Sequence, residues 1–267
     1  MAELILVTGG TGTVGCVVSE RLLDAGAQVR VLSRGLRSIG RAPHVVGDVR
    51  TGEGLTEAMR DVDTIVHCVD PAHHVVDAAL AAAKPHLVFI SIVGVDRVPL
   101  GYYQRKLADE QLIMGSGLPW TVLRTTQFHD LIAAALRMLA KPPILVVPAG
   151  WRAQPIDVRE VGARLAELAL DGPAGRVAEM GGPEVLPIAE LARRYLAAVG
   201  KRRPVVSLPL PGRVSRGYRT GGNLTPEHAV GTIPFERYLD EQLAAGTWPY
   251  SDAIRSYLRL PRRFRSR

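Results

Sequence analysis

The sequence is poor in cysteine, which restricts the kinds of protein it can encode. Only Cys16 and Cys68 occur among 267 residues, and their spacing fits neither a disulfide framework nor a metal site. No apolar run is long enough to span a membrane, and the first predicted strand begins at residue 3, which leaves no room for a signal peptide. We therefore expect a cytoplasmic protein that holds no metal and does not enter a membrane.

Aromatic side chains are also scarce, at 5% of the residues. A large flat ligand would find few stacking partners beyond Phe128, Trp151 and Tyr218, which argues against a dedicated flavin site. The arginines behind the net charge of +7 are scattered, and their densest run is the C-terminal tail, residues 262–267. We therefore expect a small-molecule substrate and no nucleic acid, and the sequence leaves the oligomeric state open.

What the chain does contain is a glycine-rich turn near its start. An apolar run over residues 4–7 predicts a buried parallel strand, and apolar residues at helical spacing follow over 17–25. The glycines between them have the spacing of a dinucleotide-binding turn. Such a turn presents backbone N–H groups and a helix N-terminus to the phosphates of a dinucleotide. The residues predicted to do this are Gly9, Thr11, Gly12, Thr13, Val14 and Gly15.

The acidic residue that would select NAD is missing. In NAD-binding folds it follows the glycines by about twenty residues, but no Asp or Glu lies between residues 24 and 48. Ser33 and Arg34 occupy that position, and a guanidinium there bonds a 2′-phosphate, so we predict that the cofactor is NADP(H). Arg37 or Arg41 could assist. The alternative is that Arg34 is a solvated loop residue.

Two further pairs of residues are predicted to contact the cofactor. Asp48 and Val49 follow the third predicted strand, where a carboxylate commonly meets the adenine amino group, although Asp48 is equally suited to capping a helix. Cys68 and Val69 end the fourth predicted strand and are assigned to the same cofactor.

Strands and helices alternate along the first 124 residues. Strands are predicted over 4–7, 28–33, 44–47, 63–69, 86–91 and 120–124, and helices over 17–25, 52–59, 73–83 and 102–114. This alternation predicts an α/β fold, a doubly wound parallel Rossmann sheet with right-handed crossovers. Residues 1–124 are therefore expected to form an NADP-binding Rossmann core.

Residues 125–267 are expected to form a small C-terminal α/β substrate lobe that is interwoven with this core in one compact unit. Strands are predicted over 144–147, 177–180 and 204–208, and helices over 131–139, 158–169, 187–199 and 233–245, with Asp157 as a helix cap. The segment 209–232 is rich in Gly, Pro and Arg and predicts a loop or short helix over the cleft.

The residues just after the sixth predicted strand are candidates for the substrate site. Thr126, Gln127 and Phe128 fall at the carboxyl edge of the sheet, where open α/β folds bind their ligands. His129 is either a second acid or base beside them or a packed residue at the start of a helix.

The fifth predicted strand and the helix after it carry the candidate chemistry. Ser91 ends the strand, and the i, i+4 spacing of Tyr102 and Lys106 puts both on one helical face. In that arrangement the ammonium bonds the nicotinamide ribose and favours ionisation of the phenol, while the phenol exchanges a proton with a substrate oxygen. The alternatives are an ordinary surface pair on an amphipathic helix and a serine that bonds the local backbone.

Several segments resemble the atypical short-chain dehydrogenase/reductases, and within them the NmrA-like NAD(P)-binding proteins. They are Thr8-Gly9-Gly10-Thr11-Gly12-x-x-Gly15, Val31-Leu32-Ser33-Arg34, Ser91-Ile92-Val93-Gly94, Tyr102-Tyr103-x-x-Lys106, and residues 123–129 and 154–161. The resemblance implies binding of NADP. Catalytic members also use an asparagine after the fourth strand, whereas the only asparagine here is Asn223, which leaves Asp70 or Asp77 as substitutes.

The sequence therefore predicts an NADPH-dependent oxidoreductase that reduces a small carbonyl, quinone or enone by hydride transfer. Tyr102 would be the acid, Lys106 its electrostatic partner, and Ser91 would bond the substrate oxygen. The alternatives are a non-catalytic protein that senses NADP(H) for a regulatory partner, as the family also contains, and an NADP-dependent epimerase or isomerase.

Overall fold

Seven parallel strands form the central sheet of this computed structural model, which describes residues 3–35 and 42–246. Their order is β3-β2-β1-β4-β5-β6-β9, so the direction of strand addition reverses beside β1. The strands are β1 Leu4–Thr8, β2 Gln28–Ser33, β3 His44–Val46, β4 Thr64–His67, β5 His86–Ile92, β6 Trp120–Thr125 and β9 Gly175–Arg176. The predicted doubly wound Rossmann sheet is confirmed.

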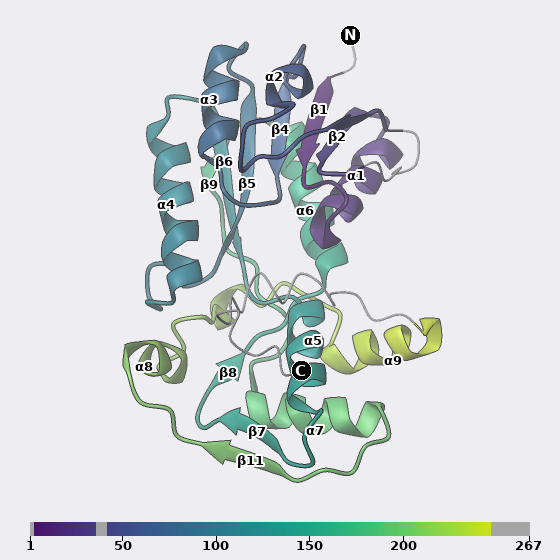
Figure 1. Cartoon of the computed structure of the whole chain (residues 1–267), viewed down its shortest axis with the longest axis vertical. Helices are drawn as coiled ribbons and strands as arrows, with labels where there is room; N and C mark the ends of the chain where they lie inside the picture. The colour runs from purple at the N-terminus through teal and green to yellow at the C-terminus, as the bar shows by residue number, and fades with distance from the viewer. Residues whose placement is uncertain (1–2, 36–41, 247–267) are drawn as a thin grey trace, which may run out of the picture.

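Helices cover both faces of this sheet (Figure 1). One face carries α1 (Thr13–Asp24) and α6 (Val158–Asp171), and the other carries α2 (Leu55–Ala58), α3 (His73–Ala81) and α4 (Gly101–Gly115). Strand β1 contributes to both layers because successive side chains of a strand point to opposite faces. Ile5 and Val7 pack with α1 and α6, and Leu6 packs on the other side. An apolar run without polar interruption is therefore what this central position requires.

The C-terminal half of the chain returns to the nucleotide-binding half in two places. Helix α6 lies beside α1, where a Cβ atom at Gly162 would be 2.5 Å from Val17, and β9 extends the sheet next to β6. The predicted cap is confirmed, since the Asp157 carboxylate accepts a hydrogen bond from the backbone N–H of Arg159 at 2.8 Å.

The strand predicted over 177–180 is wrong in its position. Strand β9 covers only Gly175–Arg176, and further on the chain meets β6 through a single bridge between Met180 and Thr125. Between these points Glu179 lies 4.0 Å from the guanidinium of Arg124.

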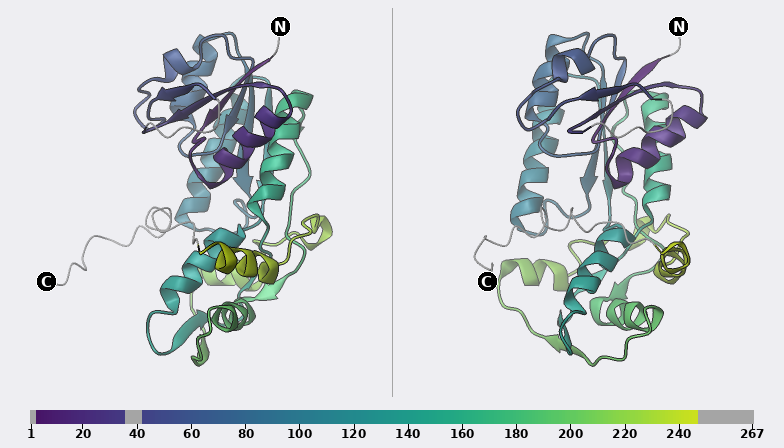
Figure 2. Two further views of the ribbon diagram at one scale, coloured as in Figure 1. Left: turned by 90° about the vertical axis from the view of Figure 1, so that its right-hand side faces the viewer. Right: turned by 45° about the vertical axis from the view of Figure 1, so that its right-hand side comes forward.

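The remaining elements form a lobe below the carboxyl edge of the sheet (Figures 1 and 2). They are α5 His129–Leu139, β7 Leu145–Pro148, β8 Arg152–Ala153, β10 Leu186–Pro187, α7 Ile188–Ala198, β11 Val205–Leu208, α8 Arg213–Arg219, a 3-10 turn Pro226–His228 and α9 Phe235–Ala245. β7 pairs with β11 and β8 with β10. The lobe has an apolar core of its own, which includes Leu136, Leu145, Leu191 and Phe235.

The segment 209–232 contains α8 and the 3-10 turn, in agreement with the predicted loop or short helix. None of the helices within residues 3–35 and 42–246 is long and apolar enough to cross a membrane. In the same ranges, no group of three or more His, Cys, Asp or Glu residues is arranged to hold a metal ion. Arg37, Arg41 and the tail 262–267 lie outside the described residues.

Candidate active site

A cavity of about 700 Å³ opens where β1, β4, β5 and β6 end. This is the edge of the sheet at which open α/β folds bind their ligands. The cavity gathers residues from the glycine turn, from the ends of three strands and from α4. The predicted site residues that line it are Gly12, Thr13, Val14, Cys68, Val69, Ser91, Tyr102, Lys106, Thr126, Gln127 and Phe128.

The glycine turn is shaped for a close approach of backbone to ligand. Gly9 has a φ of +70°, which a side chain would strain, and its N–H donates to the carbonyl of Leu32 at 2.9 Å. A Cβ atom at Gly15 would lie 2.3 Å from the carbonyl oxygen of Gly9, so only glycine allows α1 to pack this close. Because Gly12 offers no side chain to cap α1, the first-turn N–H groups of the helix are left for an anion. These residues fit the pyrophosphate of a dinucleotide.

Asp70 connects the two residues predicted to carry the chemistry. Its carboxylate accepts a hydrogen bond from the hydroxyl of Tyr102 at 3.1 Å and pairs with the ammonium of Lys106 at 2.6 Å. Burial would raise the pKa of the Asp70 carboxyl, but the charge and hydrogen bond of Lys106 outweigh it and hold that pKa below its ordinary value. Tyr102 and Lys106 therefore share one carboxylate at the cavity wall.

Lys106 is a buried ammonium and not a surface residue. Only 5% of its side chain is exposed, and its Nζ lies 4.3 Å from the ring centre of Phe89. The alternative of an ordinary surface pair with Tyr102 does not describe this geometry.

Ser91 presents a buried hydroxyl to the same cavity. It is 1% exposed, and its Oγ has no hydrogen-bond partner within the described part of the chain. A buried hydroxyl is seldom left unsatisfied in a folded protein. The alternative of a serine that bonds its local backbone is therefore not observed. The Ser91 hydroxyl is suited to bond an oxygen of a ligand.

Thr126, Gln127 and Phe128 form the wall where the sheet meets the lobe. Thr126 donates its hydroxyl proton to the carbonyl of Gln154, and Gln127 donates weakly to the carbonyl of Asn223 at 3.4 Å. Phe128 precedes α5 and packs against the core shared by α1 and α6.

His129 lies away from the cavity. It is fully buried, its Nε2 meets the carbonyl oxygen of Ile233 at 2.9 Å, and its ring packs against Phe235 and Tyr238. Burial lowers the pKa of His129, which keeps the ring neutral. His129 is thus the packed residue at the start of α5, because α9 covers it, and we do not assign it to the substrate.

The residues predicted to contact the 2′-phosphate and the adenine of the cofactor do not line this cavity; they are Ser33, Arg34, Asp48 and Val49. Ser33 bonds the ring of His44 at 2.7 Å, and Arg34 is exposed directly after β2. The Asp48 carboxylate accepts from the backbone N–H of Arg50 at 2.9 Å within the turn, and it does not cap α2, whose N-cap is Gly54. Val49, beside it, is buried.

Cys68 forms part of the cavity wall without being a reactive group. Burial raises the pKa of the Cys68 thiol to about 12, so it stays protonated at neutral pH.

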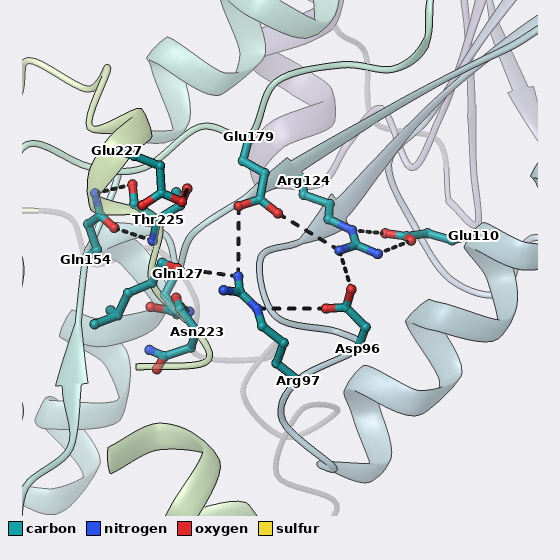
Figure 3. Close-up of polar contacts among 11 residues, drawn as sticks. Asp96, Arg97, Glu110, Arg124, Gln127, Gln154, Glu179, Asn223, Thr225 and Glu227 are labelled. Atoms are coloured by element: carbon teal, nitrogen blue, oxygen red, sulfur yellow. Dashed lines mark hydrogen bonds and ion pairs between the residues drawn. The ribbon is translucent and has the colours of Figure 1, made fainter. Parts of the chain in front are cut away.

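An ion-pair network holds β6, the strand that leads to Thr126, against α4 (Figure 3). Arg124 on β6 donates twice to Glu110 on α4, at 2.9 and 2.7 Å, and once to Asp96 at 3.0 Å. A fork of this kind has a fixed geometry, so it sets the distance between α4 and β6. Thr126 follows two residues later. The network thereby holds the helix of Tyr102 against the strand of Thr126.

Other cavity residues were not predicted from the sequence. The sequence indicated Asp70 only as a substitute for an asparagine, and it assigned no role in the site to Arg50, Tyr103 or Arg105. Arg105 lies 5.8 Å from the ring centre of Tyr102. Its spacing of three residues from Tyr102 on one helix is the signal that could have pointed to it.

Comparison with known proteins agrees with this geometry. The NAD(P)H-binding family matches residues 9–142. The (4-alkanoyl-5-oxo-2,5-dihydrofuran-3-yl)methyl phosphate reductase of Streptomyces griseus is 31% identical over 211 residues, which is 74% of each chain. The NAD(P)H azoreductase of Xenophilus azovorans is 28% identical over 223 residues, 78% of each chain. The quinone oxidoreductase 2 of Escherichia coli is 24% identical over 218 residues, 74% of this chain and 76% of that one.

Solved structures share the fold. The Escherichia coli NADPH-dependent quinone oxidoreductase complexed with NADPH has a TM-score of 0.76 at 20% identity, covering 90% of this chain and 99% of that one. The Citrobacter sp. triphenylmethane reductase complexed with NADP(H) has a TM-score of 0.72 at 18% identity, covering 89% and 99%. The chain therefore belongs to the NAD(P)H-binding, NmrA-like family of atypical short-chain dehydrogenase/reductases and is an NAD(P)-dependent oxidoreductase.

Proposed function

We propose that this enzyme uses NADPH to reduce a small carbonyl, quinone or enone, with Tyr102 as the proton donor. The observation that carries the proposal is the single cavity lined by the glycine turn, Ser91, Tyr102 and Lys106. A dinucleotide whose phosphates lie on the turn extends along the sheet edge toward these side chains. Residues 125–246 would supply the opposite wall through Thr126, Gln127 and Phe128, which is the proposed role of the C-terminal lobe.

The nicotinamide, when bound, supplies a hydride to the substrate carbon. The chain's own residues then act on the oxygen. Ser91 donates a hydrogen bond to it, which orients the substrate, and Tyr102 transfers its phenolic proton to it as negative charge develops there. The product is an alcohol or its conjugate equivalent, and Tyr102 regains a proton from water. Lys106, which shares the Asp70 carboxylate with Tyr102, supplies a positive charge near the phenol that offsets the charge remaining on the phenolate.

The relatives indicate which compounds to try first. The name of the Streptomyces griseus relative describes a reductase of an oxo-dihydrofuran that carries an alkanoyl group, and another relative is named as a quinone oxidoreductase. Conjugated carbonyl compounds and quinones are therefore the first substrates to test.

The test is NADPH oxidation against quinones, enones, ketones and aldehydes by the wild type and Tyr102→Phe. We expect turnover to fall by about 100-fold or more in Tyr102→Phe with NADPH affinity kept, since only the proton donor is lost. Tyr195→Phe, which removes a hydroxyl from α7 in the core of the lobe, is the matched control and should keep full turnover. Undiminished turnover in Tyr102→Phe contradicts the assigned donor. NADPH binding with no turnover of any compound favours the NADP(H)-sensing alternative.

We also propose that Arg34 selects NADPH over NADH. Its exposed guanidinium follows β2, where a 2′-phosphate would lie. Arg34→Ala should weaken NADPH binding by about 10- to 100-fold, the worth of a charge-assisted hydrogen bond, and leave NADH binding unchanged. Arg21→Ala, on the exposed side of α1, is the matched control for loss of positive charge. Equal affinities of the wild type for the two cofactors, measured by fluorescence titration, would contradict the assignment.

A further inference from the structure

Asp70 differs from an asparagine at the same place because it carries a charge. Its two oxygens are both used: Oδ1 by the Lys106 ammonium at 2.6 Å and Oδ2 by the Tyr102 hydroxyl at 3.1 Å. An amide would offer a single acceptor oxygen and no charge. The carboxylate instead accepts from both residues at once and neutralises the buried ammonium.

The hydrogen bond between Tyr102 and Asp70 has a defined direction. An ionised carboxylate can only accept, so the phenol must be the donor and must keep its proton while the bond exists. Lys106 holds Asp70 in the ionised form, as the lowered pKa of that carboxyl indicates. The arrangement therefore favours the neutral phenol over the phenolate.

The other titratable groups around Asp70 do not reverse this balance. His67, at the end of β4, is fully buried, and burial lowers its pKa to about 3, so its ring is neutral. Asp109 lies one turn beyond Lys106 on α4 and accepts from the backbone N–H of Ala72 at 3.1 Å, and burial raises the pKa of its carboxyl. Lys106 is thus the one positive group paired with Asp70 among the described residues. Arg105, 5.8 Å from the ring centre of Tyr102, adds a second positive charge that is the same in the wild type and in Asp70→Asn.

We propose that Asp70 is a positioning residue that holds Tyr102 in its protonated form and so sets the site for reduction. This inference rests on the proposed function, in which Tyr102 is the proton donor. Reduction needs a phenol that can give its proton to the substrate oxygen. Oxidation of an alcohol needs a phenolate that can accept one, and an uncompensated Lys106 would favour that form. Asp70 thereby sets the resting protonation state of Tyr102, which is the form that reduction needs.

The decisive measurement is the titration of Tyr102 itself, which requires neither cofactor nor substrate. The ultraviolet absorbance of tyrosinate is followed with rising pH in the wild type and in Tyr102→Phe, and the difference between the two curves isolates Tyr102. The same pair is measured in the background of Asp70→Asn. We expect Tyr102 to ionise about 1 to 2 pH units lower in Asp70→Asn, because Lys106 is then unopposed. An unchanged or higher pH of ionisation overturns the proposal.

Two further variants separate this role from a structural one. Asp77→Asn removes an exposed carboxylate from α3 and should leave the titration of Tyr102 where it is in the wild type. Asp70→Asn combined with Lys106→Met removes both charges and should return the titration toward the wild-type pH. If the double variant titrates as low as Asp70→Asn alone, the change is not due to Lys106 and the proposal fails.

Activity supplies an independent check. In Asp70→Asn the alkaline limit of NADPH-dependent reduction should move to lower pH by the same amount as the ionisation of Tyr102. The acid limit of alcohol oxidation should move to lower pH by the same amount, because that direction needs the phenolate. If the wild type reduces no compound, the proposed function fails, and the titration of Tyr102 still decides what Asp70 does.

Discussion

The nucleotide-binding half and the C-terminal lobe are held together by different kinds of contact. In the first, the strands are apolar on both faces and the glycine turn is restricted by close contacts of backbone with backbone, as at Gly15, although the same half also contains the buried ion pair of Arg124 with Glu110. In the lobe, buried polar side chains join segments that are far apart in the sequence. Tyr238 donates to the carboxylate of Asp130 at 3.1 Å, across 108 residues.

Gln154 shows the second kind of contact most clearly. It is fully buried, donates to the carbonyls of Gly182 and Thr225, and accepts from the N–H of Thr225 at 2.9 Å (Figure 3). A buried amide with several partners specifies one arrangement of the loops around it, because a wrong arrangement leaves the amide without hydrogen bonds. The contrast teaches that the glycine turn depends on shape, and the loops around Gln154 on polar pairing.

The largest effect on the free energy of unfolding is expected at Gly15, where the backbone leaves no room for a side chain. Gly15→Ala places a Cβ atom 2.3 Å from the Gly9 carbonyl oxygen and 2.8 Å from the Cα of Gly10, and neither backbone atom can rotate away. We expect a loss of about 3 kcal/mol or more in the free energy of unfolding, measured by urea denaturation. NADPH affinity should fall with it, since α1 and the turn must separate.

Gly115→Ala is the control for this change. Gly115 ends α4, and a Cβ atom there would meet nothing within 4 Å. The same substitution should therefore be neutral or stabilise by up to about 1 kcal/mol, because alanine favours the helix. Equal losses in the two variants would show that the glycine turn is not restricted by shape.

The buried carboxyl of Asp130 in the lobe predicts a pH-dependent effect of intermediate size on the free energy of unfolding. Burial raises the pKa of Asp130 to about 6 in the folded protein, against 3.8 for an ordinary carboxyl. As pH rises through this window the unfolded chain releases a proton that the folded chain retains, so folding loses stability, and the full penalty is present above pH 6. Asp130→Asn should remove it and stabilise the protein at pH 8 by about 1 to 3 kcal/mol.

The pH dependence distinguishes this effect from a change in packing. Thermal or urea unfolding should give the same stability for the wild type and Asp130→Asn below about pH 3, where the carboxyl is protonated in both states. A gain that persists unchanged in that acid range, or a loss at pH 8, would contradict the assigned pKa. The amide oxygen of the variant can still accept the hydroxyl proton of Tyr238.

The same contrast explains what the sequence could predict. Strands β1 to β6 and the helices between them were placed to within about four residues at their ends, because each is specified by its own hydrophobic period. Within the candidate site, the assignment of Ser91, Tyr102 and Lys106 to one cavity follows from their places on consecutive elements. Their chemical roles stay predictions.

Contacts between distant residues could not be predicted. Nothing near His129 in the sequence indicates that α9 will cover it, since its partner Ile233 is 104 residues away. The link from Asp70 to Tyr102 spans 32 residues, and it depends on how the loop after β4 meets α4. Local patterns set the elements, whereas such pairings are set by the packing of the whole chain.

The smallest effect is expected at Asp157, the polar cap through which the lobe returns to the sheet. Its buried carboxylate accepts from the N–H of Arg159 at 2.8 Å and pairs with that residue's guanidinium. Asp157→Ala should cost about 1 kcal/mol at pH 7, since the guanidinium is largely exposed and adds little beyond the cap.

This effect should depend on pH in the opposite sense from that of Asp130. Burial would raise the pKa of Asp157, but the hydrogen bonds and charge of Arg159 outweigh it and lower that pKa in the folded protein. The stabilisation is therefore present above the ordinary carboxyl range and is lost as pH falls below it. Glu167→Ala, which removes an exposed partner of Arg164 on the same helix, should change the free energy of unfolding by less than about 0.5 kcal/mol at either pH. A cost for Asp157→Ala that grows in acid would contradict the cap as the source of the stability, because protonation already removes the charge that makes the carboxylate a strong acceptor.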